Sequence, residues 1–321
     1  MDALSEILKS MKMGHVRAGT LSFTAPWAVA VEGLDMPTAY GVSAGGPCWL
    51  RVPDREAIQL ARGDVVLVKG PHQLLSSPES HPVLDMRDIF SACGVAYFKP
   101  NQEPISPLHI KWGAGGAETR MLGLAFEPVG GERNPLVASL PRCIVLRSGR
   151  FTWIDSAIEF LTLDGVESPG YAATARLLAE LIFVSIVRAH LLNESKGSRG
   201  WLCGLTDPGI AKALLGMHES PGTDWTVGSL ASMAALSRTA FAARFADLVG
   251  VTPIHYLTQW RMHLAAERIL RSRTNLTQLA FELGYASDAA FRDAFKRRYG
   301  IAPSRFGLDK DPRDGEQATR D

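Results

Sequence analysis

Residues 285–301 read YASDAAFRDAFKRRYGI, a short helix-like run with three consecutive cations near its end. The pattern of this run recurs at a shift of 50 residues, where 235–251 reads ALSRTAFAARFADLVGV. In both copies a pair of phenylalanines is followed by a glycine and then by a proline. The matching pairs are Phe241 with Phe291, Phe245 with Phe295, Gly250 with Gly300 and Pro253 with Pro303. Internal repetition of this kind indicates that one structural unit occurs twice.

Each copy is expected to be a helix, a tight turn and a second helix. The first helices are short and apolar, SLASMAA at 229–235 and TQLAFEL at 277–283. Glycine ends the second helix because it adopts the left-handed conformation readily, and the proline beyond it has no backbone donor. Helix-turn-helix units place their second helix in the major groove of DNA. Two copies with the same aromatic spacing predict such units at about 229–250 and 277–300.

A long helix is expected between the two units. The segment PIHYLTQWRMHLAAERILRSR at 253–273 is long enough to hold them apart as a rigid strut. If both second helices enter adjacent major grooves, their centres should be one helical turn apart, ~34 Å. The strut is basic and suits phosphates, because it carries Arg261, Arg268, Arg271 and Arg273. For at least some of these four residues an ordinary solvated helix face explains the charge equally well.

Charge is distributed unevenly along the chain, although the formal net charge is only +1. Residues 205–308 contain 12 Lys and Arg against 8 Asp and Glu, a net charge of +4. Subtracting these from the totals of 34 and 33 leaves 22 against 25, or −3, for the rest. A basic C-terminal third in a nearly neutral protein favours a polyanionic partner such as DNA.

The span from about Trp225 to Phe306 resembles the C-terminal DNA-binding domain of the AraC/XylS family of bacterial transcriptional regulators. The resemblance covers the last third of the chain. It rests on the segments WTVGSLASMAALSRTAFAARFADLVGVTPIHYLTQWRMHLAAERIL and LTQLAFELGYASDAAFRDAFKRRYGIAPSRF. It implies sequence-specific binding of double-stranded promoter or operator DNA. It is also compatible with the contact to RNA polymerase that an activator makes.

The second helix of the second unit is expected to present one polar face to DNA. Ser287 is suited to cap its N-terminus. At helical spacing the core side is formed by Ala290, Phe291, Ala294, Phe295 and Arg298. The opposite side is formed by Asp288, Ala289, Arg292, Asp293 and Lys296.

The groups on this opposite side can distinguish base pairs. Arg292 can bind guanine through two hydrogen bonds, and Asp288 and Asp293 can accept from the amino group of cytosine. Lys296 and Arg297 lie further along the helix and suit phosphate better. The predicted DNA-contacting residues of this unit are Ser287, Asp288, Ala289, Arg292, Asp293, Lys296 and Arg297. The alternative for each is an ordinary solvated surface residue.

The corresponding helix of the first unit begins at Ser237 and has a less polar outer face. Its predicted DNA-contacting residues are Arg238, Thr239, Ala242, Ala243 and Arg244. The two alanines can make only apolar contacts, for example with thymine methyl groups. Members of the resembled family often carry longer polar side chains there. Arg238 and Arg244 are therefore expected mainly to position the DNA backbone.

Residues from about 20 to 165 have the pattern of a β-rich domain. Short apolar runs are separated by Gly and Pro, as in GDVVLVKGP at 63–71 and CIVLRSG at 143–149, which favours a sandwich or barrel. This half resembles the cupin-type sensor domain of one AraC/XylS subgroup through MDALSEIL, APW, CWLRV, GDVVLV and LIFVSIVRAHL. The expected fold class is α+β. A cupin-like β-barrel followed by helices precedes an all-α domain with two helix-turn-helix units joined by a long helix.

The apolar residues of 168–193 cover most of a helix surface, more than one buried stripe requires. That helix is either buried within its domain or shared with a second copy in a homodimer. The predicted boundaries are a sensor and dimerisation domain at 1–195, a linker at 196–206, a DNA-binding domain at 207–308 and a disordered tail at 309–321.

An enzymatic cupin would need a metal site, and the sequence lacks the residues for one. Metal-binding cupins use a His-x-His with a nearby carboxylate and a further His beyond a Gly-Asp stretch. The second element resembles GDVVLVKGPH at 63–72, which offers His72, but 37–49 has no histidine or carboxylate for the first. A single imidazole does not hold a catalytic metal. No catalytic residue, metal or cofactor is therefore expected, and a metal-dependent cupin enzyme is the least favoured alternative.

The cupin resemblance implies a small-molecule effector in the barrel, whose binding is relayed to the DNA-binding domain. Trp49 and His72, together with Cys48, could line such a pocket. Plain burial in the core explains Cys48 and Trp49 as well. The alternative is a ligand-independent regulator whose N-terminal domain only dimerises.

The sequence carries no signal for export or membrane insertion. The four cysteines form no C-x-x-C pair, so a reducing compartment fits best. The start MDALSEILKSMKMG lacks the apolar core of a signal peptide, and no apolar run reaches membrane-spanning length. We expect a soluble, cytoplasmic protein without a membrane partner.

Overall fold

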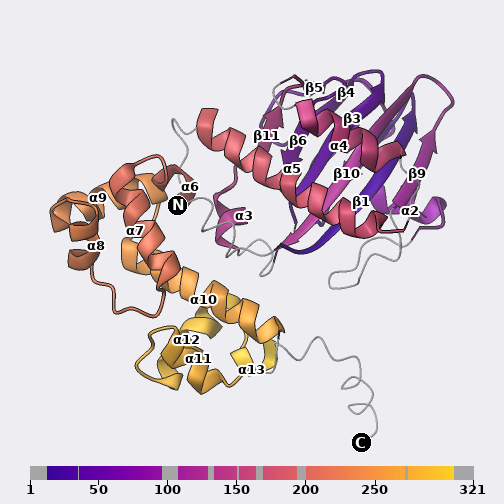
Figure 1. The fold of residues 1–321 in the computed structure, drawn as a ribbon. Helices are drawn as coiled ribbons and strands as arrows, with labels where there is room; N and C mark the ends of the chain where they lie inside the picture. The colour runs from indigo at the N-terminus through magenta and orange to yellow at the C-terminus, as the bar shows by residue number, and fades with distance from the viewer. Residues whose placement is uncertain are drawn as a thin grey trace, which may run out of the picture. The chain divides into compact units, whose positions relative to one another are not determined.

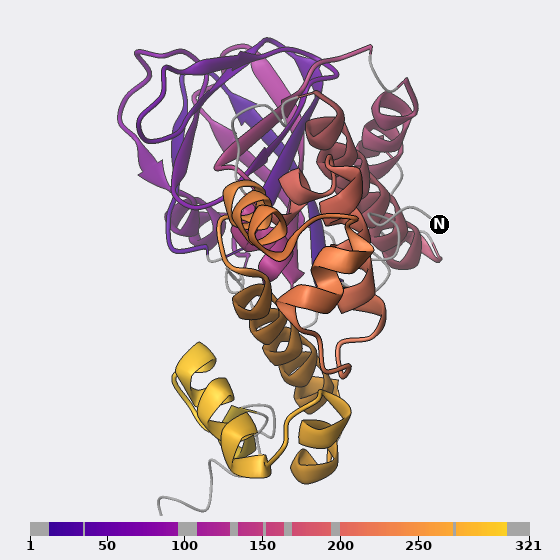
Figure 2. The ribbon, with the colours of Figure 1, turned by 90° about the vertical axis from the view of Figure 1, so that its left-hand side faces the viewer.

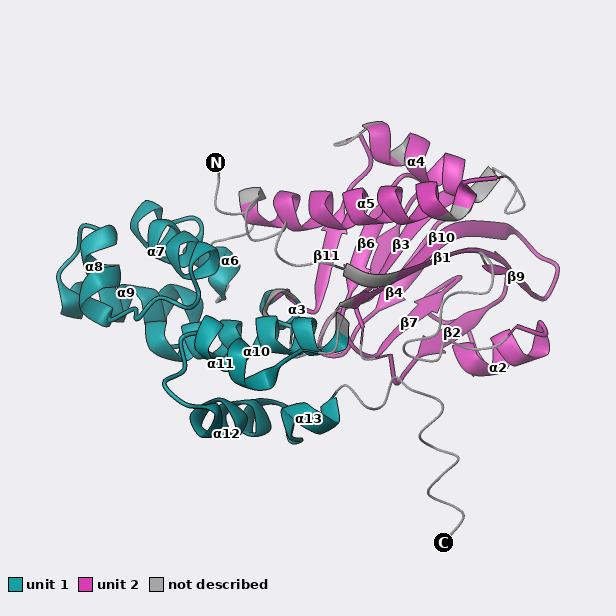
Figure 3. Ribbon diagram, turned by 60° about the horizontal axis from the view of Figure 1, so that its bottom comes forward, with its two compact units in different colours: residues 1–12, 132–139, 194–321 teal, residues 13–131, 140–193 magenta. Residues whose placement is uncertain are grey.

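The computed structural model describes residues 13–34, 36–95, 108–128, 134–149, 152–163, 169–193, 200–271 and 274–306. The chain divides into a β-rich unit and a helical unit (Figure 3). Residues 13–131 and 140–193 form the first, and residues 132–139 and 194–321, with 1–12, form the second. This order agrees with the predicted α+β class. The predicted disordered tail at 309–321 lies outside the described residues.

The β-rich unit contains two sheets. The strand order is β11-β6-β3-β10-β1-β9 in one and β5-β4-β7-β2-β8 in the other. The first sheet consists of β1 (Met13–Thr24), β3 (Thr38–Gly45), β6 (Val65–Val68), β9 (Leu108–Gly113), β10 (Glu118–Pro128) and β11 (Cys143–Leu146). The second consists of β2 (Ala28–Val31), β4 (Cys48–Arg51), β5 (Ile58–Leu60), β7 (His72–Leu75) and β8 (Leu84–Asp85). Neighbours are antiparallel, except that β1 pairs with β9 and β2 with β8 in parallel.

The two sheets enclose a common apolar core. Alternation along β4 directs Cys48 and Leu50 into it, and alternation along β6 directs Val66 and Val68 into it. Helix α2 (Met86–Ala92) adds three buried side chains, among them Phe90. Burial of each such side chain contributes roughly 1.5–3 kcal/mol.

Helices cover the outer face of the six-stranded sheet. Figure 1 shows α4 (Thr152–Leu163) and α5 (Tyr171–Asn193) lying along it, and α5 confirms the helix expected at 168–193. A Cβ at Gly41 of β3 would come within 2.6 Å of Cδ1 of Ile158 of α4, so α4 packs closely on the backbone of β3 there. The rings of Phe126 and Phe183 meet at 5.0 Å between β10 and α5. This cover explains why every residue of β6 is buried, on both faces of the strand.

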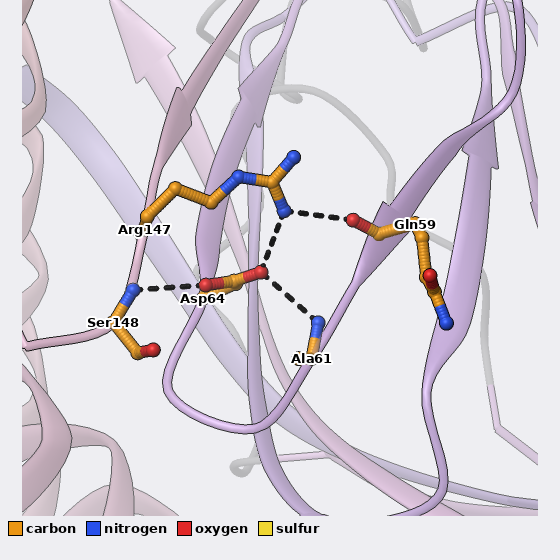
Figure 4. A network of polar contacts seen from close by, with 5 residues as sticks. All are labelled: Gln59, Ala61, Asp64, Arg147 and Ser148. Carbon is orange, nitrogen blue, oxygen red and sulfur yellow. Dashed lines mark hydrogen bonds and ion pairs between the residues drawn. The ribbon is translucent and has the colours of Figure 1, made fainter.

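The buried Asp64 is the centre of a polar network in the β-rich unit (Figure 4). Its carboxylate accepts hydrogen bonds from the amides of Ala61 at 3.0 Å and Ser148 at 2.8 Å and from Nη1 of Arg147 at 2.8 Å. The same Nη1 donates to the carbonyl oxygen of Gln59 at 2.8 Å. The aspartate of the Gly-Asp stretch is therefore used to join the β5–β6 turn to the end of β11.

The helical unit is built around one long helix. Its elements are α3 (Pro135–Ser139), α6 (Trp201–Gly204), α7 (Pro208–Glu219), α8 (Val227–Met233), α9 (Arg238–Val249), α10 (Pro253–Arg271), α11 (Leu276–Glu282), α12 (Asp288–Tyr299) and α13 (Pro303–Phe306). Figure 2 shows α10 running from the α7–α9 group to the α11–α13 group, as the predicted strut requires. In the part of the chain that the structure describes, no helix is both long and apolar enough to span a bilayer.

The C-terminal part of the predicted linker at 196–206 contains a short helix, α6. Residues 196–199 lie outside the described residues, but Trp201, Leu202 and Cys203 form a buried helical turn. The amide of Gly200 donates to the carbonyl oxygen of Leu248 at 2.9 Å, which ties this turn to α9. Burial of three consecutive apolar side chains stabilises this turn, so residues 201–203 pack within the helical unit.

Candidate nucleic-acid interface

The two segments that repeat in the sequence have the same backbone geometry at their turns. In the first unit the amide of Leu236 donates to the carbonyl oxygen of Ala231 at 3.0 Å, and in the second Tyr285 donates to Ala280 at 2.9 Å. The turn residue has a positive φ in both, 54° at Ala235 and 77° at Gly284. These equivalent turns confirm two helix-turn-helix units, α8–α9 and α11–α12.

Both second helices begin and end in the same way. The hydroxyl of Ser237 accepts from the amide of Ala240 at 3.3 Å, and that of Ser287 accepts from Ala290 at 3.2 Å. Each helix ends at a left-handed glycine, with φ of 85° at Gly250 and 81° at Gly300. The prediction that Ser287 caps its helix is therefore confirmed, and the caps define where each helix starts.

Aromatic pairs hold both helices against the rest of the unit. Phe241 and Phe245 have ring centroids 5.6 Å apart, and Phe291 and Phe295 have centroids 6.0 Å apart. All four side chains are fully buried. They are core residues, as predicted, and they fix which face of α9 and α12 points outward.

The outward face of α12 carries most of the residues that were predicted to contact DNA. Its exposed side chains among them are Ala289, Arg292, Asp293, Lys296 and Arg297. Asp288 is half-buried, and Ala290, which was predicted on the core side, is exposed. The buried side of α12 begins only at Phe291, so the first turn of the helix extends beyond the core.

Arg292 is already oriented by a neighbour on its own helix. Its Nε donates to Oδ2 of Asp288 at 2.5 Å, one helical turn earlier. The bond leaves both Nη groups of the guanidinium outside this contact. A base edge could then be read by a preordered arginine, which loses less side-chain entropy on binding.

The outward face of α9 differs in what its arginines contact. Arg238, Thr239, Ala243 and Arg244 are exposed, and Ala242 is half-buried. Arg244 forms an ion pair with Asp207, whose carboxylate also caps α7 by accepting from two backbone amides.

Arg238 lies against α8, because a Cβ at Gly228 would meet its Nε at 2.8 Å. Both arginines of α9 therefore have contacts within the fold.

The arginines of the strut do not form one phosphate-facing row. Arg261 donates to three backbone carbonyl oxygens, those of Pro221, Thr223 and Gly284. Arg268 pairs with Glu282 of α11. Both guanidiniums thus join elements of the helical unit, and phosphate contact by the strut stays a prediction. The side chains of 271 and 273 lie outside the described residues.

The two residues predicted to bind a ligand do not lie together. His72 is buried, and its ring nitrogens bond to the hydroxyl of Tyr40 and the carbonyl oxygen of Gly70, each at 2.9 Å. Burial lowers the pKa of His72 to about 4, so the ring is neutral at neutral pH. Trp49 points to the opposite face of its sheet from Cys48 and Leu50. Alternation along the strand could have separated Trp49 from the core residues.

A small cavity of about 40 Å³ lies in the β-rich unit between β1, β3, β10 and α2. Its walls are mainly apolar and include Leu21, Met86 and Phe90. The polar side chains of Arg17, Thr38 and Tyr40 also line it. Arg17 pairs with Glu127 at 3.6 Å, and the buried hydroxyl of Thr38 has no hydrogen-bond partner among the residues that the structure describes. Neither His72 nor Trp49 lines this cavity.

Metal-ligating side chains do not gather in the described parts of the chain. No group of three or more His, Cys, Asp or Glu side chains there could hold a metal ion. That the protein is not an enzyme stays a prediction.

Two family models match the chain, a cupin model over residues 2–192 and a helix-turn-helix domain model over residues 230–307. An AraC-like transcription regulator of Streptomyces antibioticus is 32% identical over 316 residues, which cover 95% of this chain and 98% of that protein. The chain belongs to the AraC-like transcriptional regulators. It is a DNA-binding regulator with an N-terminal cupin domain and a C-terminal helix-turn-helix domain.

The chain is also similar to a further regulator and to two solved structures. The regulator AlkR of Acinetobacter baylyi is 26% identical over 95% of this chain and 99% of its own length. Among solved structures, the DNA-binding domain of AdpA with a target DNA matches 34% of this chain and 98% of that chain, at 27% identity and a TM-score of 0.32. Fatty-acid-bound ToxT of Vibrio cholerae matches 92% of this chain and 96% of its own, at 12% identity and a TM-score of 0.36.

Proposed function

We propose that this AraC-type regulator inserts α9 and α12 into adjacent major grooves and that α12 supplies most of the base-specific contacts. The observation that carries this proposal is the exposed polar face of α12. Arg292 binds guanine there, while Asp288 and Asp293 accept from cytosine amino groups. Lys296 and Arg297, nearer the end of the helix, bind phosphate oxygens.

In this proposal α9 mainly sets the position of the protein on DNA. Thr239, Ala242 and Ala243 make short-range contacts, of which those of the alanines are apolar. Arg238 and Arg244 contact phosphates, and Arg244 keeps its ion pair with Asp207. The first box of the operator is therefore read less strictly than the second.

The test is footprinting of the wild-type protein and of Arg292→Ala on operator DNA, with Lys296→Ala as the matched control. Arg292→Ala is expected to cost ~1–3 kcal/mol on the cognate site and to relax specificity at one base pair. Lys296→Ala should weaken binding to all sequences about equally and lower the dependence of affinity on salt. An unchanged footprint for Arg292→Ala would show that α12 faces DNA differently.

The β-rich unit, which includes α5, is the sensor and dimerisation domain in this proposal, and residues 207–308 of the helical unit are the DNA-binding domain. Support for a homodimer comes from α5, where Leu177 is 61% and Leu181 48% exposed. Residues four apart lie on one face of a helix, so these leucines form an apolar strip that a second copy would cover.

The dimer is tested by replacing Leu177 and Leu181 with Glu. The variant is expected to sediment as a monomer, because two carboxylates cannot be buried in an apolar contact. Arg62→Glu, in the exposed β5–β6 turn, is the control and should sediment like the wild-type protein. A double variant with the wild-type sedimentation coefficient would place the dimer contact elsewhere.

The effector in this proposal is a small, mainly apolar molecule with one polar group. The walls of the cavity support the apolar character, and the hydroxyl of Thr38 offers a hydrogen bond. A drug-sized ligand needs ~300–1,000 Å³, so the cavity of about 40 Å³ must widen when such a molecule binds. Met86 and Phe90 of α2 are the side chains whose movement would widen it.

The small volume of this cavity also favours the second candidate, a regulator whose β-rich unit only dimerises. Thermal unfolding with small apolar compounds, measured in parallel with operator affinity, separates the two. An effector must change operator affinity, and DNA must change effector affinity by the same factor. Compounds that raise the melting temperature without changing operator affinity would favour the ligand-independent regulator.

The remaining parts of the proposal concern the cellular role. The protein is a non-enzymatic cytoplasmic regulator that contacts RNA polymerase as an activator. Transcription with purified RNA polymerase, with and without the protein, tests this: more transcript from the operator-bearing promoter supports activation, and less transcript supports repression.

A further inference from the structure

Arg261 lies near the middle of α10, and its guanidinium reaches both helix-turn-helix units. Nε donates to the carbonyl oxygen of Pro221 at 2.7 Å, and Nη2 donates to that of Thr223 at 2.9 Å. Nη1 donates to the carbonyl oxygen of Gly284 at 3.4 Å. Pro221 and Thr223 belong to the loop before α8, whereas Gly284 is the turn residue between α11 and α12. One planar group thus joins the two units.

The loop at 220–225 moves with the first unit because internal hydrogen bonds brace it. The indole of Trp225 and the amide of Thr223 both donate to the carbonyl oxygen of Ser220, at 2.9 Å and 3.2 Å. The next residue, Thr226, caps α8 through a reciprocal pair of bonds with Ser229. A displacement of this loop therefore displaces α8.

The backbones of this loop and of the second turn touch directly. A Cβ at Gly222 would lie 2.3 Å from the carbonyl oxygen of Glu282. A Cβ at Gly284 would lie 2.5 Å from the carbonyl oxygen of Gly222 and 2.7 Å from Nη2 of Arg261. Such approaches exclude any side chain at either position without a shift of the backbone. This backbone contact therefore forms at only one separation of the two units.

The guanidinium is also held from the side. Its Cζ lies 5.8 Å from the ring centroid of Tyr285, the first residue after the second turn. The rigid planar fork of arginine can satisfy three carbonyl oxygens at fixed angles, whereas the single ammonium of lysine cannot reproduce this geometry.

We infer that Arg261 fixes the separation and angle of α9 and α12 and so makes this regulator selective for the spacing of its two DNA boxes. The inference rests on the proposed insertion of both helices. One added base pair moves the second box by about 3.4 Å and rotates it by about 35° around the DNA axis. A long helix can bend enough to follow part of such a change, but the bonds of Arg261 hold the units against it.

The experiment compares full-length wild-type protein, Arg261→Ala and Arg261→Lys on duplexes that carry the two footprinted boxes. The boxes stand at native spacing or with one or two base pairs inserted or removed, and affinity is measured at one salt concentration. The wild-type protein is expected to bind at least about tenfold more weakly after a one-base-pair change. Both variants should bind the native spacing more weakly but lose less than about threefold when the spacing changes.

Two further variants make the test specific. Arg268→Ala removes one charge from the same helix but leaves the hydrogen bonds of Arg261 intact. The dependence of its affinity on box spacing should match that of the wild-type protein. Gly222→Ala forces the loop away from Glu282 without a change of charge, and it should broaden or shift the preferred spacing. The Gly222→Ala result also decides the question if Arg261→Ala does not fold.

The outcomes separate this inference from the function on which it rests. If each Arg261 variant binds more weakly than the wild-type protein by the same factor at every spacing, Arg261 serves stability or phosphate contact, and the inference is overturned. Two protected boxes whose affinity does not depend on spacing in the wild-type protein would also overturn it, while the proposed function would stand. Protection of a single box would overturn both.

Discussion

Helices α9 and α12 have the same length, 12 residues, and the same Ser and Gly caps, but their outer faces use side chains differently. On α9 Arg244 pairs with Asp207, and the guanidinium of Arg238 lies close to the backbone of Gly228. On α12 the polar residues stand outward, and Arg292 is oriented only by Asp288 of the same helix. The two helix-turn-helix units thus share one backbone geometry and the same pair of core phenylalanines, whereas the side chains on their outer faces differ.

The cores of the two units also differ at one pair of matching positions, 256 after α9 and 306 after α12. Tyr256 of the first unit bonds to His218 at 2.6 Å, and His218 stacks on Trp260 at a centroid distance of 3.9 Å. The matching Phe306 of the second unit packs on Phe295 at 5.1 Å and on Tyr299 at 4.9 Å. At this position the first unit buries an imidazole against its tyrosine, whereas in the second unit the half-buried Phe306 packs on two aromatic rings.

The largest expected effect tests whether the two cores are equivalent. Phe245→Ala and Phe295→Ala each remove a fully buried ring, and each is expected to lower the free energy of unfolding by ~3–5 kcal/mol. Urea unfolding followed by circular dichroism measures both. A loss below about 1 kcal/mol in only one variant would show that the two cores do not support their helices equally.

The next effect concerns acid stability of the first unit. Burial, and then the charge of His263, lower the pKa of His218 to about 3, and burial and the charge of Arg298 lower that of His263 to about 4. The unfolded histidines bind protons at about pH 6.5. Stability is therefore complete above pH 6.5 and is lost as the pH falls toward 4, by about 3 kcal/mol for His263 alone.

The control for this prediction is His218→Gln, whose amide can still bond to the hydroxyl of Tyr256. Urea unfolding at pH 7.5, 6 and 5, followed by tryptophan fluorescence, should show a smaller loss of stability with acid in the variant than in the wild-type protein. Equal slopes would mean that His218 is not the group that titrates.

The smallest effect concerns the two turns. Ala235 holds a φ of 54° that costs an alanine roughly 1 kcal/mol, so Ala235→Gly is expected to be neutral or stabilising. Gly284→Ala should destabilise by ~1–3 kcal/mol, because its Cβ would meet the carbonyl oxygen of Gly222 at 2.5 Å as well as adopt a strained φ of 77°. Thermal unfolding of both variants measures the difference. Equal effects of the two substitutions would contradict the close approach at Gly284.

Local patterns made the helical unit predictable from sequence. Serine caps, C-terminal glycines and phenylalanines at helical spacing act within a few residues of one another, so the two units and the strut were found correctly. The capping of Ser287 and the burial of Phe291 follow from such patterns. The burial of Trp201 was not predicted, because the composition of KGSRGW is typical of a linker.

Long-range contacts explain what the sequence did not reveal. Arg261 bonds to residues 23 and 40 positions away, and nothing in its own helix distinguishes it from a solvated arginine. The bond of His72 to Tyr40 likewise joins two strands that are 32 residues apart. The position of Trp49 was predictable, since the alternation of Cys48, Trp49 and Leu50 already separates the two faces of β4.

The claim that α12 reads sequence while α9 positions the protein is tested most directly by selecting sites from random DNA. Wild-type protein, Arg292→Ala and Arg238→Ala are compared at one salt concentration. Arg292→Ala is expected to lose its preference at one base pair of the second box. Arg238→Ala should bind every selected sequence more weakly and keep the wild-type preferences. An unchanged motif for Arg292→Ala, or an altered one for Arg238→Ala, would contradict the account.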